Sequence, residues 1–393
     1  MKKQILYMVC ATALLSSCHI YKSYDRPEDI TTSGLYRDPI AENDTLVSDT
    51  TNFGNLPWRE VFTDPQLQSL IEAGLKQNTD LLTAAQNVKA AEASLLSARL
   101  AYALSWRLCP QGTISSFDKN AATKTYSLPV TASWQVDLFG QLLNSKRNAQ
   151  VTLKQTKAYR QAVQTQVISN IANMYYTLMM LDRQLEITKS TAEILKKNAE
   201  TMEAMKDAAM YNINSTGVEQ SKAAYAQVLA SIPDIEQSIR ETENALSTFL
   251  GEAPHAIKRG TLEAQVLPTE LSAGVPIQLL SNRPDVKAAE MALASCYYNT
   301  NSARAAFYPQ ITLSGSAGWT NSAGSAIINP GKLLASAVGS LTQPLFYRGQ
   351  NIARLKAAKA QEESAKLSFQ QALLNAGSEV SNALSLYQKT SEK

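Results

Sequence analysis

Apolar side chains recur at coiled-coil spacing over two long stretches of the chain, and this spacing limits the possible folds more than any other feature. In the first stretch the intervals alternate between four and three residues after the first step, at Val163, Val167, Ile171, Met174, Leu178, Leu181, Leu185, Thr188, Ala192, Leu195, Ala199 and Met202. In the second they alternate between three and four, at Val218, Ser221, Tyr225, Val228, Ile232, Ile235, Ile239, Thr242, Leu246 and Phe249. Such seams predict helices that pack lengthwise against a neighbour.

A turn-rich link, Asn212–Gly217, separates the two seams, so we expect two long antiparallel helices here. If the first helix runs from Gln141 to Met202, it is about 90 Å long at 1.5 Å per residue. That length suits a rod that crosses a wide compartment better than a globular core. Pro233 lies inside the second seam and should kink its helix or shift its register.

Shorter helices and strands are predicted on either side of this hairpin. Asp64-Pro65 is a good N-cap and first-turn pair for a helix that starts at Gln66, and the alanine-rich stretch 81–103 has high helix propensity. Two segments alternate between apolar and polar residues, at Val130, Ala132, Trp134, Val136 and Leu138, and at Ile311, Leu313, Gly315, Ala317 and Trp319. Each fits a strand of a membrane barrel or, equally well, an amphipathic strand of a soluble sheet.

The chain repeats itself at an offset of about 205 residues. Asn78-Thr79-Asp80-Leu81 aligns with Arg283-Pro284-Asp285-Val286, and an arginine follows each aspartate after nineteen residues, Arg99 and Arg304. Leu138-Phe139-Gly140-Gln141 aligns with Leu345-Phe346 and Gly349-Gln350 after a two-residue insertion. The repeat predicts two units of helix, strand, strand and long helix.

The predicted boundaries follow from this duplication. The first repeat is 57–260, with strands in about 107–138 and a long helical hairpin in about 141–250. The second is 261–393, with a helix in about 284–306, strands in about 310–345 and a long helix from about 350. By repeat arithmetic the second copy stops roughly 60 residues early, so it is interpreted as incomplete.

A third seam lies in this second copy, at Ala365, Phe369, Ala372, Ala376, Glu379, Ala383 and Leu386. In the first copy the returning helix covers the equivalent seam. The incomplete repeat has no such helix, so we expect the seam to be exposed. Residues past about Gln350 should then be frayed, misassembled or dependent on a neighbouring chain.

The first residues have the features of a secretory signal. Lys2 and Lys3 precede a short apolar run, and Leu15-Ser16-Ser17-Cys18 resembles the bacterial lipobox. Residues 1–17 are therefore predicted to be a signal peptide, with Cys18 as the lipidated mature N-terminus and 18–56 as an irregular tether. A plain signal peptide with a chance cysteine is the alternative.

Composition argues against several functional classes. The formal charge is +3, and removal of residues 1–17 takes away Lys2 and Lys3 and leaves +1, which gives no electrostatic case for nucleic acid. With only His19 and His255 present, histidine-based metal sites and catalytic triads are nearly excluded. We find no phosphate-binding glycine loop, zinc-ligand spacing or serine elbow, and therefore expect no enzyme and no cofactor.

One extended motif carries a family resemblance. Asn282-Arg283-Pro284-Asp285-Val286, followed by Ala303-Arg304-Ala305-Ala306-Phe307-Tyr308-Pro309-Gln310, resembles the signature of the TolC-like outer-membrane efflux factors, lipoprotein branch. Trp134-Gln135-Val136-Asp137-Leu138-Phe139-Gly140 and Leu250-Gly251-Glu252-Ala253-Pro254 support it. Within the signature we favour structural roles for Arg283, Pro284, Asp285, Arg304, Phe307 and Pro309 over a binding or catalytic site.

The resemblance implies a mainly α-helical fold with membrane β structure. Three protomers would form one tube, with a twelve-stranded β-barrel in the outer membrane and a long coiled-coil barrel in the periplasm. The duct would dock on a periplasmic adaptor and an inner-membrane pump, most often of the RND type, and conduct small molecules passively. The alternatives are the duct of a type I protein-secretion system and a purely structural coiled-coil lipoprotein.

Overall fold

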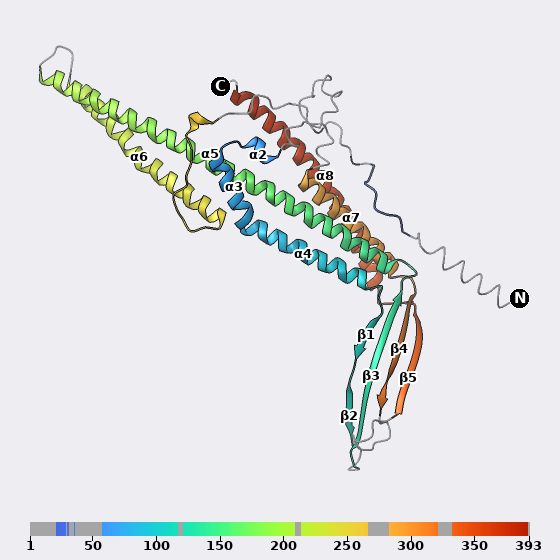
Figure 1. Cartoon of the computed structure of the whole chain (residues 1–393). Helices are drawn as coiled ribbons and strands as arrows, with labels where there is room; N and C mark the ends of the chain where they lie inside the picture. The colour runs from blue at the N-terminus through green and yellow to red at the C-terminus, as the bar shows by residue number, and fades with distance from the viewer. Residues whose placement is uncertain are drawn as a thin grey trace. The chain divides into compact units, whose positions relative to one another are not determined.

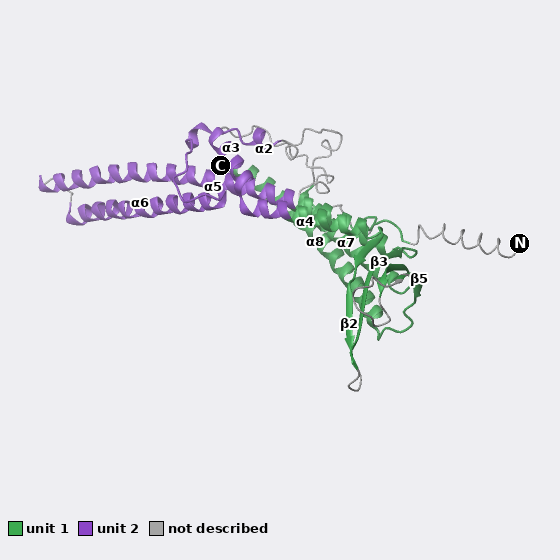
Figure 2. Ribbon diagram, turned by 60° about the horizontal axis from the view of Figure 1, so that its bottom comes forward, with its two compact units in different colours: residues 1–38, 87–159, 280–393 green, residues 39–86, 160–279 purple. Residues whose placement is uncertain are grey.

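The computed structural model describes residues 21–28, 30, 35, 57–116, 121–208, 214–265, 283–320 and 332–391. The predicted signal peptide, Cys18 and most of the predicted tether lie outside these residues. The chain divides into two compact units (Figure 2): unit 1 comprises residues 1–38, 87–159 and 280–393, and unit 2 comprises 39–86 and 160–279. The units therefore cut across the two sequence repeats.

The order of the elements follows the duplication (Figure 1). The first series is α2 (Trp58–Val61), α3 (Pro65–Gln77), α4 (Thr79–Leu100), β1 (Ser105–Leu108), β2 (Gln111–Ser115), β3 (Thr123–Val136), α5 (Gln141–Asp207) and α6 (Ser215–Leu250). After the short 3₁₀ helix η4 (Leu262–Ala264), the second series is α7 (Pro284–Ala305), β4 (Gln310–Thr320), β5 (Lys332–Thr342) and α8 (Gln350–Ser391). Helix, strands and long helix thus recur in the same order.

The two repeats share a specific backbone conformation where the strands end. Gly140 precedes α5 with φ of 72°, and Gly349 precedes α8 with φ of 75°. Only glycine adopts these angles without steric cost, since a Cβ would crowd the following carbonyl. The glycines that the sequence alignment paired therefore make the same strand-to-helix turn.

Side-chain caps set the predicted helix ends in unit 2. Asp64 accepts a hydrogen bond from the Gln66 backbone N–H at 2.8 Å and caps α3, as its position before Pro65 predicted. Asn214 caps α6 by accepting from the Gly217 N–H at 2.9 Å. Helix α6 continues through Pro233, which is exposed, and the seam keeps its register because Ile232 and Ile235 both remain covered.

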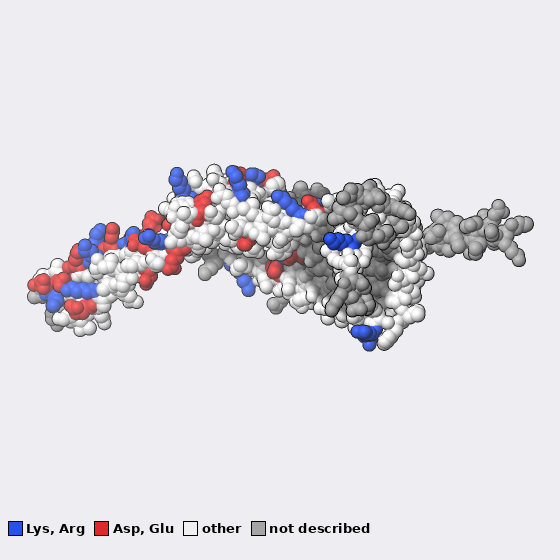
Figure 3. All heavy atoms as spheres, turned by 90° about the horizontal axis from the view of Figure 1, so that it is seen from below, with Lys and Arg blue, Asp and Glu red and all other residues white. Residues whose placement is uncertain are grey.

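The α5–α6 hairpin confirms the coiled-coil seams. No residue of either predicted seam is exposed, and Ile171, Leu178 and Leu246 are fully buried. Ion pairs flank the seam on the hairpin, Lys189–Glu236 at 2.9 Å and Lys222–Glu203 at 2.5 Å. Figure 3 shows acidic and basic side chains intermixed along the hairpin on the visible face. At 1.5 Å per residue, the 67 residues of α5 span about 100 Å.

The expectation of an exposed seam on α8 is wrong for the first half of that seam. Phe369 and Ala376 of α8 are buried in a cluster with Val286 and Leu293 of α7 and with Ile30, and Leu35 packs against it. The N-terminal segment and α7 thus supply the cover that a returning helix supplies to α5. Glu379, Ala383 and Leu386 are exposed, as predicted for the whole seam.

The N-terminal segment is held on unit 1 by specific polar contacts. Arg26 makes two hydrogen bonds of 2.8 Å with the carboxylate of Glu290 on α7, and the Tyr298 hydroxyl accepts one from the Tyr24 N–H at 3.0 Å. At Gly377 of α8, an added Cβ would collide with the Leu35 carbonyl oxygen. The described part of the tether has no helix or strand, but it is a docked segment.

Candidate functional site

The sheet of unit 1 has strand order β1-β3-β4-β5, with β2 also paired to β3 (Figure 1). Its strands are antiparallel, and the register places Val130 opposite Ala317, Trp134 opposite Leu313 and Val136 opposite Ile311. Because directly opposed residues share a face, the two apolar sets predicted from separate repeats lie on one face.

This apolar face extends over every strand. Its members are Trp106, Leu108, Ile114, Tyr126, Leu128, Val130, Ala132, Trp134, Val136, Ile311, Leu313, Ala317, Trp319, Leu333, Ala335, Ala337 and Leu341. The opposite face is mainly Ser, Thr and Gln, and its Ser316 and Ser336 hydroxyls are 2.8 Å apart. The sheet is therefore sharply two-faced.

Exposure distinguishes the two interpretations that the alternation left open. Trp106, Leu333 and Leu341 expose 68%, 68% and 67% of their surfaces, so the described residues do not cover the apolar face. A soluble sheet buries its apolar face against another layer, whereas a membrane strand turns it to lipid. The arrangement fits a lipid-facing sheet.

Aromatic side chains mark two levels on this face. Trp106 and Trp134 lie toward the end of the sheet that joins the helices, and Tyr126 and Trp319 lie toward the other end. Tyr126 and Trp134 are eight residues apart on β3, about 27 Å at 3.3–3.4 Å per residue. Membrane β-proteins have an apolar band about 25 Å tall between two aromatic girdles. The spacing therefore fits one bilayer crossing.

The two repeats are joined where the strands meet the helices. The rings of Phe139 and Tyr308 stack with centroids 4.9 Å apart at 11°. The Gln141 side-chain oxygen accepts from Gln135 at 3.2 Å and from Gln310 at 3.0 Å. These contacts fix the β3–α5 turn against the start of β4.

Half of the predicted signature residues lie at this same junction. Arg304 donates to the Asn301 side chain at 2.8 Å, one turn earlier on α7. The Phe307 carbonyl accepts from the Gln343 side chain at 3.0 Å, and Pro309 directly precedes β4. Each of these three residues therefore shapes the end of α7 or the start of β4.

The other half lies at the opposite end of α7. Arg283 precedes the helix, Pro284 is its first residue, and the Arg283 guanidinium donates to Asp285 at 2.7 Å and to Glu379 of α8 at 2.6 Å. Hydrogen bonds to Asp285 and Glu379 raise the pKa of Arg283 despite its partial burial. Burial alone would raise the pKa of Asp285, but Arg283 and the Val286 N–H hold it below its usual value. Arg283 thus links α7 to α8.

The signature residues do not converge on one site. Arg283 and Arg304 stand at opposite ends of α7, about 30 Å apart along a 22-residue helix. Among the described residues, no group of three or more His, Cys, Asp or Glu side chains could hold a metal ion. No helix in the same part of the chain is both long and apolar enough to cross a bilayer.

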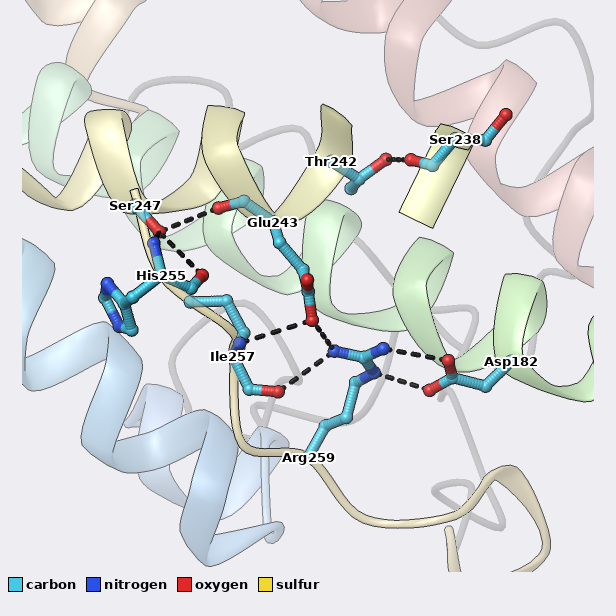
Figure 4. Close-up of polar contacts among 8 residues, drawn as sticks. All are labelled: Asp182, Ser238, Thr242, Glu243, Ser247, His255, Ile257 and Arg259. Carbon is cyan, nitrogen blue, oxygen red and sulfur yellow. Dashed lines mark hydrogen bonds and ion pairs between the residues drawn. The ribbon is translucent and has the colours of Figure 1, made fainter. Parts of the chain in front are cut away.

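An ionic cluster that the sequence did not reveal lies in unit 2 (Figure 4). The Arg259 guanidinium donates to both carboxylate oxygens of Asp182 at 2.5 and 2.8 Å, to Glu243 at 2.5 Å and to the Ile257 carbonyl at 2.9 Å. Its hydrogen bonds with Asp182 and Glu243 raise the pKa of Arg259 although burial opposes this. Its three charged partners are 77 and 16 residues apart in sequence, so no local pattern connects them.

A second polar network lies beside the first. The Tyr175 hydroxyl donates to the Asp64 carboxylate at 2.7 Å and accepts from the Gly260 N–H at 3.1 Å, and Gln265 donates to Asp64 at 2.9 Å. Burial and the bond to Asp64 raise the pKa of Tyr175 to about 12. For Asp64, burial would raise the pKa, but the bonds from Tyr175, Gln265 and Gln66 outweigh it and lower the pKa.

Comparison with known proteins is consistent with this arrangement. A family model described as outer membrane efflux protein matches residues 70–252 and 275–393. The cation efflux system protein CusC of Escherichia coli O6:H1 is 28% identical over 391 residues, which covers 98% of this chain and 83% of the relative. The probable outer membrane lipoprotein SilC of Salmonella typhimurium is 27% identical over 365 residues, with 89% and 76% covered. The toluene efflux pump outer membrane protein TtgC of Pseudomonas putida is 28% identical over 401 residues, with 98% and 80% covered.

Solved structures have the same fold. A crystal structure of CusC superposes with a TM-score of 0.78 at 26% identity and covers 95% of this chain and 84% of its own. The outer-membrane channel OprN gives a TM-score of 0.81 at 26% identity, with the same shares covered. The open state of the Neisseria gonorrhoeae MtrE channel gives 0.79 at 26% identity, with 95% and 83% covered. The chain therefore belongs to the outer membrane efflux protein family, and it is an outer-membrane channel of an efflux pump rather than an enzyme.

Proposed function

We propose that this chain forms the passive outer-membrane duct of a tripartite efflux pump, through which small molecules leave the cell. The observation that carries the proposal is the two-faced sheet, whose apolar face is exposed over a band about as tall as a bilayer core. Its polar face, rich in Ser and Thr, would line a water-filled lumen. The chain carries no chemistry that could supply energy, so transport would depend on a pump elsewhere.

The sheet edges support assembly from several copies. The β1–β2 edge spans 105–115 and the β5 edge spans 332–342, so the two edges have the same length. Antiparallel order through β1, β3, β4 and β5 leaves β5 antiparallel to the β1 of a second copy. Lipid does not tolerate unpaired strand edges, so these edges need partners. With four strand positions per chain, three copies would close a twelve-stranded barrel.

The helices support the same assembly. On α5, Met180, Ile187 and Ile194 repeat at heptad spacing on a face away from the α6 seam, and they expose 52%, 53% and 64% of their surfaces. On α8, Leu367 and Leu374 repeat likewise and are exposed. A helix in the wall of a closed tube has a neighbour on each side, and a second seam of this kind supplies the further contact. We propose a homotrimer with these stripes at its interfaces.

The docked N-terminal segment supports a lipid anchor at Cys18. Tyr21 lies against Gly140, since a Cβ at Gly140 would come 3.1 Å from its ring. Gly140 stands where β3 gives way to α5. Three extended residues reach about 10 Å, so an acyl chain on Cys18 would start close to the aromatic level at Trp134. We propose that the anchor and the sheet enter the same outer membrane.

The duct would work with a periplasmic adaptor and an inner-membrane transporter. CusC belongs to a cation efflux system and TtgC to a toluene efflux pump, so relatives of similar identity serve different cargoes. We propose a transporter of the RND type, with the cargo set by the transporter. Domain limits of 57–260 and 261–393 for the two repeats remain part of this proposal.

Conductance in a planar bilayer tests the proposal. The purified protein should insert and give discrete conductance steps without nucleotide or a proton gradient. Disruption of the gene should sensitise cells to at least one solvent, dye or metal salt. Protein that inserts as a trimer but never conducts would contradict the duct, and an export defect limited to a secreted protein would favour a type I secretion duct.

A further inference from the structure

The Arg259 cluster stands where the packed core of unit 2 ends. On one side, α3 and the adjoining parts of α5 and α6 share a core that includes Leu67, Ile171 and Leu246. On the other side, α5 continues for about 38 Å beyond Asp182, and α6 covers about 42 Å before Glu243, at 1.5 Å per residue. Among the described residues, this outer part of the hairpin belongs to no core cluster. The cluster therefore marks the base of a long two-helix arm.

Arg259 connects three separate elements at this base. Asp182 belongs to α5, Glu243 belongs to α6, and Arg259 lies on the segment that follows α6 (Figure 4). The same segment bonds to α5 again one heptad away, where the Gly260 N–H donates to Tyr175. This segment thus binds both helices and holds their separation at one level.

Burial makes the cluster more than a surface ion pair. The side chains of Arg259 and Glu243 are only 12% and 16% exposed, and that of Asp182 is 40% exposed. Without the guanidinium, two carboxylates would face each other with no cation between them, a strongly unfavourable arrangement in a poorly solvated place. The bidentate bond to Asp182 also fixes orientation, which a lysine ammonium cannot reproduce.

We propose that Arg259 is a positioning residue for the channel gate. It locks the base of the α5–α6 arm in the resting state, so that the arm moves about the level of Asp182 and Glu243. This proposal rests on the proposed function, because the arm moves a gate only if the chain lines a duct. Loss of the lock should loosen the arm and favour opening while the core of unit 2 stays intact.

Two measurements on the full-length protein test the lock. Hydrogen exchange should be at least about tenfold faster in Arg259→Gln for amides in 183–207 and 214–242, and unchanged in α3. In planar bilayers the same variant should open more often than the wild type. Asp182→Asn removes the charge without changing side-chain shape and should act in the same direction. Arg259→Lys should restore only part of the resting behaviour.

Arg183→Gln is the matched control. Arg183 is the next residue on α5 and pairs with Glu186 at 2.6 Å and with Glu263 of the same segment at 3.2 Å, but it is 43% exposed. Exposed ion pairs contribute little, so this variant should behave like the wild type in both measurements.

The outcomes separate the lock from the duct. Exchange and opening in Arg259→Gln and Asp182→Asn equal to those in Arg183→Gln would overturn the lock. Faster exchange throughout unit 2 would also overturn it, since that result means general destabilisation. A wild-type protein that never conducts, with the exchange pattern as expected, would contradict the duct and leave the lock as a property of the hairpin.

Discussion

Val130 of β3 lies directly opposite Ala317 of β4, and both side chains are on the apolar face midway between the two aromatic levels. The two residues are 187 positions apart in the chain. This pair places the middle of the proposed lipid-facing band, and the neighbouring pair, Thr131 and Ser316, is at the same depth on the polar face.

Arginine at this depth should distinguish the two faces. We expect Ala317→Arg to destabilise the folded, inserted protein by about 2–4 kcal/mol, because the guanidinium would face hydrocarbon at the bilayer midplane. Ser316→Arg, at the adjacent position, should cost much less because it faces the proposed lumen. Denaturant unfolding in lipid vesicles measures both. Equal losses would mean that the sheet is not lipid-facing.

Gly377→Ala should release the N-terminal segment from α8. The new methyl group would overlap the Leu35 backbone, which cannot rotate away as a side chain would. We expect a packing cost of about 1–3 kcal/mol, partly offset by up to about 1 kcal/mol from the higher helix propensity of alanine. Limited proteolysis within residues 21–35 should be faster than in the wild type. Ser378→Ala, at the exposed next position, is the control, and identical proteolysis of the two variants would argue against docking at Gly377.

The Asp64 network should make unit 2 sensitive to acid. The pKa of Asp64 in the folded protein lies below its usual value, so the carboxylate contributes stability at neutral pH. That contribution is lost as the pH falls below about 4 and through the folded-state value. Tyr175→Phe removes the hydroxyl that donates to Asp64 and should cost about 1–2 kcal/mol near pH 7.

Comparison of unfolding between pH 3 and pH 7 tests this assignment. The difference in stability between the wild type and Tyr175→Phe should narrow as the pH falls, because protonation of Asp64 weakens the same bond in the wild type. Tyr176→Phe is the control at the next position. A difference that stays constant across this range would remove Asp64 from the explanation.

Cys18→Ser should abolish the lipid anchor. In cells labelled with a fatty-acid analogue, the wild-type chain should carry label and the variant should not, because the acyl chains need the cysteine thiol and its amine. Cys109→Ser is the matched control, since Cys109 is a free, half-buried cysteine on the sheet. Unchanged labelling and processing in Cys18→Ser would refute the anchor.

Much of the fold was predictable because its signals are local. The heptad intervals in 163–202 and 218–249 depend only on helix geometry, and the structure keeps every seam residue out of solvent. The alternation in 130–138 and 311–319 depends only on strand geometry. The alignment of Gly140 with Gly349 predicted a shared turn, which both residues make with positive φ.

The ionic and docking contacts were not predictable in this way. Asp182, Glu243 and Arg259 are three of many charged residues, and only the packing of α5, α6 and the following segment brings them within 2.5–2.8 Å. The N-terminal segment has no periodicity, so nothing in it indicated that Ile30 and Leu35 would cover Phe369 on α8. The expected bare seam on α8 was wrong for that reason.

The sequence by itself determined the helix and strand types, the duplicated order and the family signature, because each depends on spacings within a few tens of residues. Only the tertiary structure decided which strands pair in which register, what covers α8 and which carboxylates Arg259 binds. Those choices depend on distances between residues that the chain separates by up to a few hundred positions, and only the folded packing sets such distances.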